Sequence, residues 1–400
     1  MAKINKRLIA WLSWSVATIL YYLQYCLLTY PTAIEKEISQ FYGLDDPLLF
    51  SLLTSATLFT YMIMQIPVGI MFDRYSVHKL LIVSAISMII GCAILAFSNN
   101  YLIAIFGRMC MGFGGSFTFI GALYICRMGF SSLLFPLLLA LTEFMSGFGS
   151  ISSVALFSVL QAYQGWQMTL IQIGIVLFVL LIIIILYVED NKNSIKNDSI
   201  TNSLKFLIKN KLILLLGINS LCMAAHFMVV SYTWGIPYII KSLHTNEVYA
   251  SSAISFLFIG FMLGCIIVGL LTRYFSVLKL MLVCAASEML VSCVILYTDT
   301  NLYEDMGLLF IAGLTTGGIL LNFNLIKKIV PMEYYGVSTG YINMCFCLSG
   351  VVFSPLIGLI AVLSAGNVML ASLPLVLANV MTVIICILLN YKKTLYVQFS

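Results

Sequence analysis

The stretch Gly69–Ile70–Met71–Phe72–Asp73–Arg74–Tyr75–Ser76–Val77–His78–Lys79–Leu80 is a short charged turn between two long apolar runs. Two hundred residues later the chain reads Gly269–Leu270–Leu271–Thr272–Arg273–Tyr274–Phe275–Ser276–Val277–Leu278–Lys279–Leu280, in which Gly, Ser, Val, Lys and Leu recur in register. A chain of 400 residues with this repeat consists of two copies of one half. The duplication therefore predicts two similar halves, each with the same order of apolar runs.

The composition excludes a soluble protein, because 62% of the residues are hydrophobic and only 9% are charged, whereas soluble domains carry about 25% charged residues. A helix needs roughly 20 apolar residues to cross a bilayer core of about 30 Å. The runs lack the alternation of a membrane β-barrel, so we expect helices. We count twelve spans, near residues 8–29, 48–70, 78–97, 101–125, 131–160, 166–188, 210–240, 248–272, 277–297, 304–329, 336–364 and 367–390. The predicted fold is an all-α membrane protein with twelve transmembrane helices.

The basic residues predict the orientation, because Lys and Arg accumulate in cytoplasmic loops. With the N-terminus inside, seventeen of the twenty Lys and Arg residues fall on the cytoplasmic side, and only Lys36 and Lys241 fall outside. We therefore expect both termini to be cytoplasmic. The low charge and the loops rich in Asn, Ile and Lys suggest a bacterial genome, so we expect the inner membrane of a bacterial cell. The polar segment 189–209 reads as a cytoplasmic linker between a first six-helix bundle, 1–188, and a second, 210–400.

Three motifs resemble the major facilitator superfamily over most of the chain. Gly69-x3-Asp73-Arg74-x4-Lys79 is similar to the family's motif between helices 2 and 3, although Ser76 stands where the family prefers Gly. The stretch from Arg108 to Gly115 is similar to its helix 4 pattern, and Gly165–Trp166–Gln167 to its entry into helix 6. The resemblance implies two six-helix halves, transport by alternating access, and a monomer. It also implies a gating role for Gly69, Asp73, Arg74 and Lys79.

The gate has a physical basis, since Asp73 at the cytoplasmic end of a span can pair with a cation or accept from a helix N-terminus of the other half. The alternative is that these basic residues only set the orientation of the loop.

Four ionisable side chains lie within the predicted spans, where they are costly and functional by default: Arg108, Glu143, His226 and Glu288. Arg108 could bind a substrate carboxylate or phosphate, or could pair with Glu143 on the neighbouring helix. Glu143 could exchange protons near neutral pH, or could be a structural carboxylate. His226 could bind a proton or the substrate, or could be a hydrogen-bonded core residue. The resemblance puts Arg108 and His226 on cavity-lining helices, and Glu288 on an outer helix, where we expect a structural role.

Further candidates for substrate contact are polar and aromatic. Tyr21, Tyr22, Gln24 and Tyr25 form a patch in the first span, from which we select Tyr25. The others selected are Tyr232 and Trp234 in the seventh span and Asn322 and Asn324 in the tenth. Gly235 and Pro237 should break the seventh helix.

The sequence therefore predicts a secondary active transporter, driven by the proton gradient, that takes up a small polar metabolite such as an amino acid, short peptide or organic anion. We expect no cofactor, metal site, nucleic-acid partner or enzymatic activity; the partners are a small-molecule substrate and the lipid bilayer. Two alternatives remain: efflux of amphipathic compounds, and a non-transporting sensor on the same fold.

Overall fold

The computed structural model describes residues 6–44, 46–153, 155, 158–188, 199–298, 301–364 and 367–396. The chain forms two compact units. The first comprises Met1–Phe206 together with Val330–Gly340, and the second comprises Leu207–Ile329 together with Tyr341–Ser400. The part of the predicted linker at 189–198 lies outside the described residues, whereas 200–209 form a helix.

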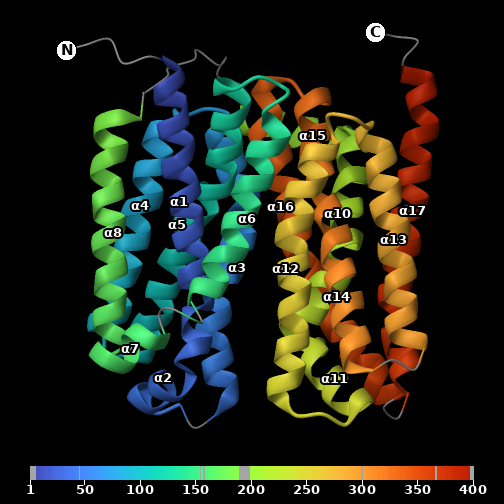
Figure 1. The fold of residues 1–400 in the computed structure, drawn as a ribbon. Coiled ribbons are helices and arrows are strands. Elements are labelled where there is room, and N and C mark those ends of the chain that lie inside the picture. Colours follow the sequence, from blue (N-terminus) through green and yellow to red (C-terminus); the bar gives the residue numbers. More distant parts are fainter. Residues whose placement is uncertain are drawn as a thin grey trace. The chain divides into compact units, whose positions relative to one another are not determined.

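The first unit is built from long helices that lie side by side (Figure 1). Its helices are α1 (Lys6–Ala33), α2 (Glu35–Tyr42), α3 (Pro47–Phe72), α4 (Val77–Phe97), α5 (Tyr101–Gly129), α6 (Phe135–Ser152), α7 (Ser158–Gln164) and α8 (Trp166–Tyr187). Helix α9 (Ile200–Lys209) follows and is divided between the two units at Phe206.

The second unit is also helical. The elements that follow α9 are α10 (Lys211–Val229), the π-helical turn η2 (Val230–Trp234), α11 (Gly235–Leu243), α12 (Glu247–Leu271), α13 (Val277–Tyr297), α14 (Leu302–Thr316), η3 (Gly317–Ile319) and α15 (Leu320–Ile329), then η4 (Met332–Tyr334), α16 (Tyr335–Leu363) and α17 (Val368–Tyr396). Of these, η4 and the first residues of α16 belong to the first unit. The seventh span contains the π-helical turn η2 directly before Gly235, but it continues as a helix through Gly235 and Pro237.

Eleven helices among the described residues are long and apolar enough to cross a membrane. The predicted first span corresponds to α1, whose 28 residues extend for about 42 Å at 1.5 Å per residue. Tyrosines, Gln24 and several hydroxyl residues make α1 more polar than the other spans. The predicted all-α membrane fold is confirmed.

The 200-residue repeat is visible in the local structure. Ser76 and Ser276 take the same position before α4 and α13, with φ and ψ of −65° and 143° for Ser76 and of −68° and 138° for Ser276. The two helices that follow are both 21 residues long. The same turn between equivalent helices shows that the sequence repeat is a structural repeat.

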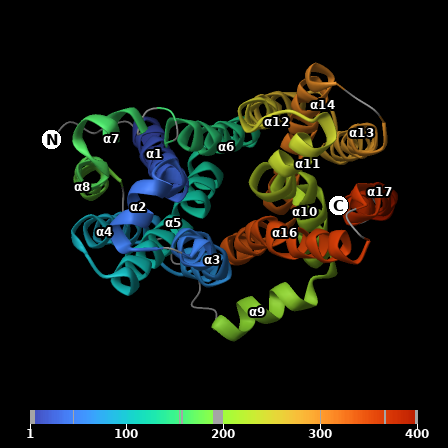
Figure 2. The same cartoon turned by 90° about the horizontal axis from the view of Figure 1, so that it is seen from below.

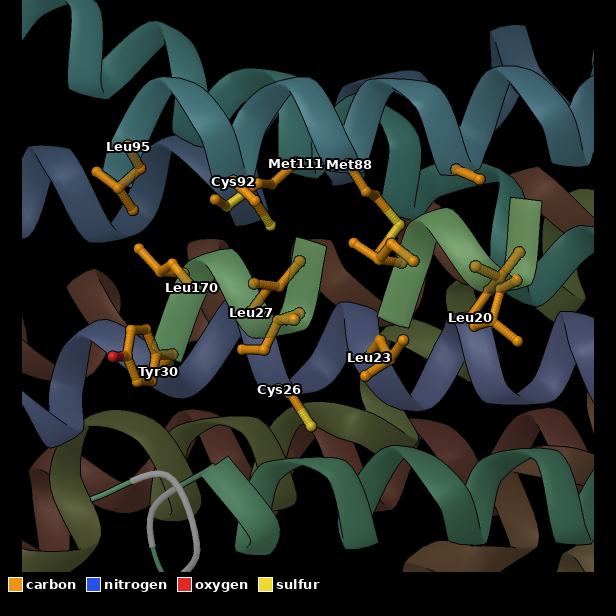
Figure 3. Packing of buried hydrophobic residues seen from close by; sticks show 14 of the residues in the cluster. Leu20, Leu23, Cys26, Leu27, Tyr30, Met88, Cys92, Leu95, Met111 and Leu170 are labelled. Atoms are coloured by element: carbon orange, nitrogen blue, oxygen red, sulfur yellow. The ribbon is translucent and has the colours of Figure 1, made fainter. Parts of the chain in front are cut away.

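The core of the first unit surrounds α1. Leu20, Leu23 and Leu27 on α1 face side chains of α4, α5 and α8, among them Met88, Cys92, Met111 and Leu170 (Figure 3). All of these residues are at most 5% exposed. Because this face of α1 packs against apolar neighbours, the polar residues on its other faces have fixed positions along the bundle.

Candidate functional site

Asp73 binds the start of α16. The backbone N–H of Gly336 donates to Asp73 Oδ1 at 2.6 Å, and that of Val337 donates to Oδ2 at 2.9 Å. The Tyr124 hydroxyl donates to Oδ1 at 3.4 Å. Amides in the first turn of a helix have no partner within the helix and carry the positive end of its dipole. The carboxyl group of Asp73, which ends α3, thus caps a helix that begins more than 260 residues later in the chain.

Glycines allow this contact. A Cβ atom on Gly69 would lie 2.3 Å from the Gly336 carbonyl oxygen, and a Cβ atom on Gly336 would lie 2.2 Å from that of Gly69. One turn later, a Cβ atom on Gly340 would lie 2.2 Å from the Gln65 carbonyl oxygen. The backbones of α3 and α16 therefore touch over residues 65–73 and 336–340.

Arg127 is the cation at this contact. Its Nη2 donates to the Val330 carbonyl oxygen at 2.6 Å, and its guanidinium carbon lies 4.2 Å from the centre of the Tyr335 ring. Arg74 and Lys79 lie in the turn after α3 and in the first turn of α4, and their predicted gating roles stay predictions. From the sequence, Arg127 is predicted only to be one of the seventeen basic residues on the cytoplasmic side.

Burial controls the charge of Asp73, which is 3% exposed. Loss of hydration raises the pKa of its carboxyl group to about 8, although the amides of Val337 and Gly336, the Tyr124 hydroxyl and the charge of Arg127 all act in the opposite direction. Asp73 can therefore change its protonation state near neutral pH.

Arg108 joins three helices of the first unit. Its Nη1 donates to the Leu27 carbonyl at 2.5 Å, and its Nη2 to those of Leu28 at 3.3 Å and Thr54 at 3.1 Å. Its Nε donates to the Leu53 carbonyl at 3.3 Å. Pro31 has no N–H, so the Leu27 carbonyl lacks the donor that residue i+4 normally supplies. The guanidinium group is 1% exposed and satisfies this carbonyl.

Glu143 has other partners, so the predicted alternative of an Arg108–Glu143 pair is not the arrangement seen. One carboxyl oxygen accepts from the Tyr21 hydroxyl at 3.3 Å, and the other accepts from Ser146 at 3.2 Å. The residue is 7% exposed. The Tyr21 hydroxyl also lies 3.5 Å from that of Tyr25, another predicted substrate contact.

Gln24 lies one turn along α1 from Tyr21 and is 2% exposed. Neither its amide nitrogen nor its amide oxygen has a hydrogen-bond partner among the described residues. Gly115 of α5 makes room for it, since a Cβ atom there would lie 2.4 Å from Gln24 Cγ. A buried amide without a partner costs free energy, and this marks Gln24 as a group that a ligand could satisfy.

In the second unit, His226 and Trp234 line one cavity, and the predicted residues have different hydrogen-bond partners. His226 Nδ1 is hydrogen-bonded to Ser292 Oγ, and Ser292 Oγ accepts a hydrogen bond from Asn379 at 3.1 Å. Asn322 accepts from Asn219 at 3.0 Å, and Asn324 is buried. Trp234 donates to the Ser354 carbonyl at 3.0 Å, and Tyr232 is 47% exposed. Glu288, the expected structural carboxylate, accepts from Thr316 at 3.1 Å.

Comparison with known proteins agrees with this architecture. The family model of the Major Facilitator Superfamily matches residues 8–355, so the chain belongs to that superfamily. It is a multi-pass membrane transporter and not an enzyme. No curated protein sequence matches the chain.

Two solved structures share the fold. One is the transporter FucP in the outward conformation, with a TM-score of 0.76, 16% identity, and coverage of 94% of this chain and 98% of that chain. The other is a variant of the E. coli fucose:proton symporter FucP, with a TM-score of 0.75, 18% identity and the same coverage. These likenesses show the fold, and the family match identifies the chain as a secondary transporter of small molecules.

Proposed function

We propose that the protein is a proton symporter for the uptake of a small polar metabolite, and that Glu143 carries the coupled proton. The observation that supports this most directly is the surroundings of Glu143, whose oxygens accept from two neutral hydroxyl groups. An ionised carboxylate at such a buried position within a span is costly. Binding of a proton removes that cost, so the site can alternate between two protonation states.

The proposed substrate site is formed by residues of α1 that lie next to Glu143 of α6. Tyr21 links the carboxyl group to Tyr25, and Gln24 supplies a donor and an acceptor that lack partners among the described residues. A substrate that bonds to the Gln24 amide would be connected to the proton site through Tyr21. Coupling requires this proximity, since occupancy by substrate and proton must affect each other.

Arg108 bears on the class of substrate. Its N–H groups donate to carbonyl groups of α1 and α3, so the guanidinium group has a structural role in joining these helices. An amide and tyrosine hydroxyls suit a neutral polar molecule better than an organic anion. We therefore add monosaccharides to the predicted amino acids and short peptides, in keeping with the fold relative, which is a fucose:proton symporter.

The Asp73 contact is proposed as the gate. Residues 336–340 must separate from α3 if α16 moves during the transport cycle, and the two amide bonds to Asp73 resist that separation. This deepens the gating role predicted for Gly69 and Asp73. We also propose that both termini face the cytoplasm, that the protein resides in the inner membrane of a bacterial cell, and that it works as a monomer.

The test is uptake into proteoliposomes of labelled amino acids, short peptides, organic acids and monosaccharides, with and without an inward proton gradient. The variants are Glu143→Gln and, as a matched control, Glu288→Gln, because Glu288 is also a carboxylate buried within a span. Accumulation that needs the gradient, is lost in Glu143→Gln and persists in Glu288→Gln supports the proposal. Equal accumulation in Glu143→Gln would contradict the proton role. Failure to take up any pool would favour efflux or a sensor.

A further inference from the structure

The second unit contains a partly open cavity of about 170 Å³. It is lined by residues of the turn η2 and of α10, α11, α13, α14, α16 and α17, which are labelled in Figures 1 and 2. Its lining residues all belong to this unit, whereas Glu143 and Gln24 belong to the first. The cavity and the proposed transport site therefore share no residues.

The walls are core residues that face empty space. Val229, Leu309, Ile357 and Leu375 line the cavity and are at most 5% exposed. Protein interiors have few voids larger than a water molecule, and an unfilled cavity lowers stability in proportion to its volume. An apolar cavity of about 150 Å³ stays dry and can bind a molecule the size of benzene. The size and walls of this cavity thus suit an apolar group of one ring or a short chain.

His226 adds one polar group to these walls. Asn379 donates to Ser292 Oγ, so the Ser292 hydroxyl proton is available for His226 Nδ1. In the tautomer in which Ser292 donates to Nδ1, the imidazole proton is on Nε2, the ring nitrogen not used by Ser292. His226 lines the cavity, and its Nε2–H can donate to one acceptor of a ligand.

The wall formed by η2 has an unusual backbone. Val230 and Trp234 line the cavity from this π-helical turn, and such turns occur frequently at functional sites. The Gly235 N–H donates to the Val230 carbonyl, and a Cβ atom on Gly235 would lie 2.2 Å from that oxygen. Gly235 therefore permits the turn that places Trp234 beside the cavity.

We propose that this cavity is a second binding site, for a neutral amphipathic molecule with an apolar body of one ring or short chain and one hydrogen-bond acceptor. The acceptor bonds to His226 and the apolar body packs against Leu309 and Leu375. Lys241 and Asp305, which also line the cavity, have opposite charges, so their fields favour neither an anion nor a cation. The proposal holds whether or not Glu143 couples transport to protons.

The fluorescence of Trp234 can report binding in the cavity, because the other tryptophans, Trp11, Trp14 and Trp166, all belong to the first unit. Purified protein is titrated with 6-bromohexan-1-ol, whose bromine quenches tryptophan fluorescence on contact, and Trp234→Phe identifies the signal from the cavity. We expect saturable quenching in the parent that Trp234→Phe abolishes. Ala371→Leu, which fills the cavity, should weaken binding at least tenfold. Ala378→Leu is the control, because Ala378 is buried on the same helix two turns away and does not line the cavity.

The proposed hydrogen bond between His226 and the ligand's acceptor is tested with 1-bromohexane, which lacks a hydroxyl group. The parent should bind the alcohol more tightly than the bromoalkane, and His226→Phe should remove that preference. Unlabelled hexanol should reverse the quenching in the unmodified protein, a result that does not depend on the folding of any variant. Quenching that rises linearly without saturation, or equal binding by Ala371→Leu, would overturn the site. Saturable quenching by a phospholipid with a brominated chain, but not by the alcohol, would assign the cavity to a lipid tail instead.

Discussion

The Arg108 guanidinium group donates at 2.5 Å to the carbonyl oxygen of Leu27, the oxygen that Pro31 leaves without an intrahelical donor. A proline on one helix and an arginine on another thus form one structural unit. This relationship explains how a cation that is 1% exposed can be held within a span among groups that carry only partial charges.

Replacement of Arg108 should destabilise the first unit. Arg108→Leu removes all four carbonyl contacts and leaves the Leu27 carbonyl unpaired, and hydrogen bonds to a charged group contribute about 1.5 to 3 kcal/mol each. We expect the free energy of unfolding to fall by at least about 3 kcal/mol. Arg108→Lys should recover only part of this loss, since one ammonium group cannot reach carbonyls on both α1 and α3. Thermal unfolding in detergent measures both variants.

Pro31→Ala gives the control by a double-mutant cycle. Residue 31 then has an N–H that can donate to the Leu27 carbonyl, so Arg108→Leu should cost less in this background. A coupling energy of about 1 kcal/mol between the two sites is expected. Additive effects of the two substitutions would contradict the link between Pro31 and Arg108.

The contact between α3 and α16 should fail when a methyl group is inserted. Gly69→Ala puts a Cβ atom 2.3 Å from the Gly336 carbonyl oxygen, a distance that requires the backbones to move apart. We expect the amides of residues 336–340 to exchange hydrogen at least tenfold faster, as measured by mass spectrometry. Gly174→Ala is the control, because its Cβ atom would meet Cys92 at an ordinary 3.7 Å. Unchanged protection in Gly69→Ala would show that the contact does not need the glycine.

The sequence predicts one side of this contact and not the other. Gly69 and Asp73 stand out because they interrupt an apolar run with a charged turn that recurs 200 residues later. Gly336 and Gly340 have the spacing of a close helix contact, but that spacing names no partner across such a separation. Arg108 contacts α1 and α3, and Glu143 contacts Tyr21, because of how α5 and α6 are rotated about their axes. The spacing of residues in the sequence does not determine these rotations. Pro31 did contain a usable signal, since a proline within a span predicts an unpaired carbonyl four residues earlier.

Protonation of Asp73 should strengthen its contact with α16. Burial raises the pKa of Asp73 to about 8 in the docked state, whereas an exposed aspartate has a pKa of about 3.9. Between these two pH values, Asp73 holds a proton when residues 336–340 contact α3 and loses it when they separate. The contact is therefore most stable below about pH 4 and weakens as the pH rises to about 8.

Hydrogen exchange of residues 336–340 at pH 6 and pH 9, corrected for the intrinsic rates, measures this effect. We expect protection to be greater at pH 6. Asp73→Asn, which cannot ionise, should show the same protection at both values and serves as the control. Greater protection at pH 9 in the parent would mean that the Gly336 and Val337 amides and Arg127 outweigh the effect of burial.

Gln24 should show opposite effects on stability and transport. Its amide has no hydrogen-bond partner among the described residues and is 2% exposed, so Gln24→Leu removes an unsatisfied polar group at little change in volume. We expect the melting temperature in detergent to stay the same or rise, and uptake to fall at least tenfold because the substrate loses its amide contact. Gln65→Leu is the matched control: Gln65 is also fully buried, but its amide nitrogen donates to the Tyr61 carbonyl at 3.2 Å, so this change should cost about 1 kcal/mol of stability. A large loss of stability in Gln24→Leu would show that the Gln24 amide serves the fold, and uptake equal to that of the parent would remove Gln24 from the proposed substrate site.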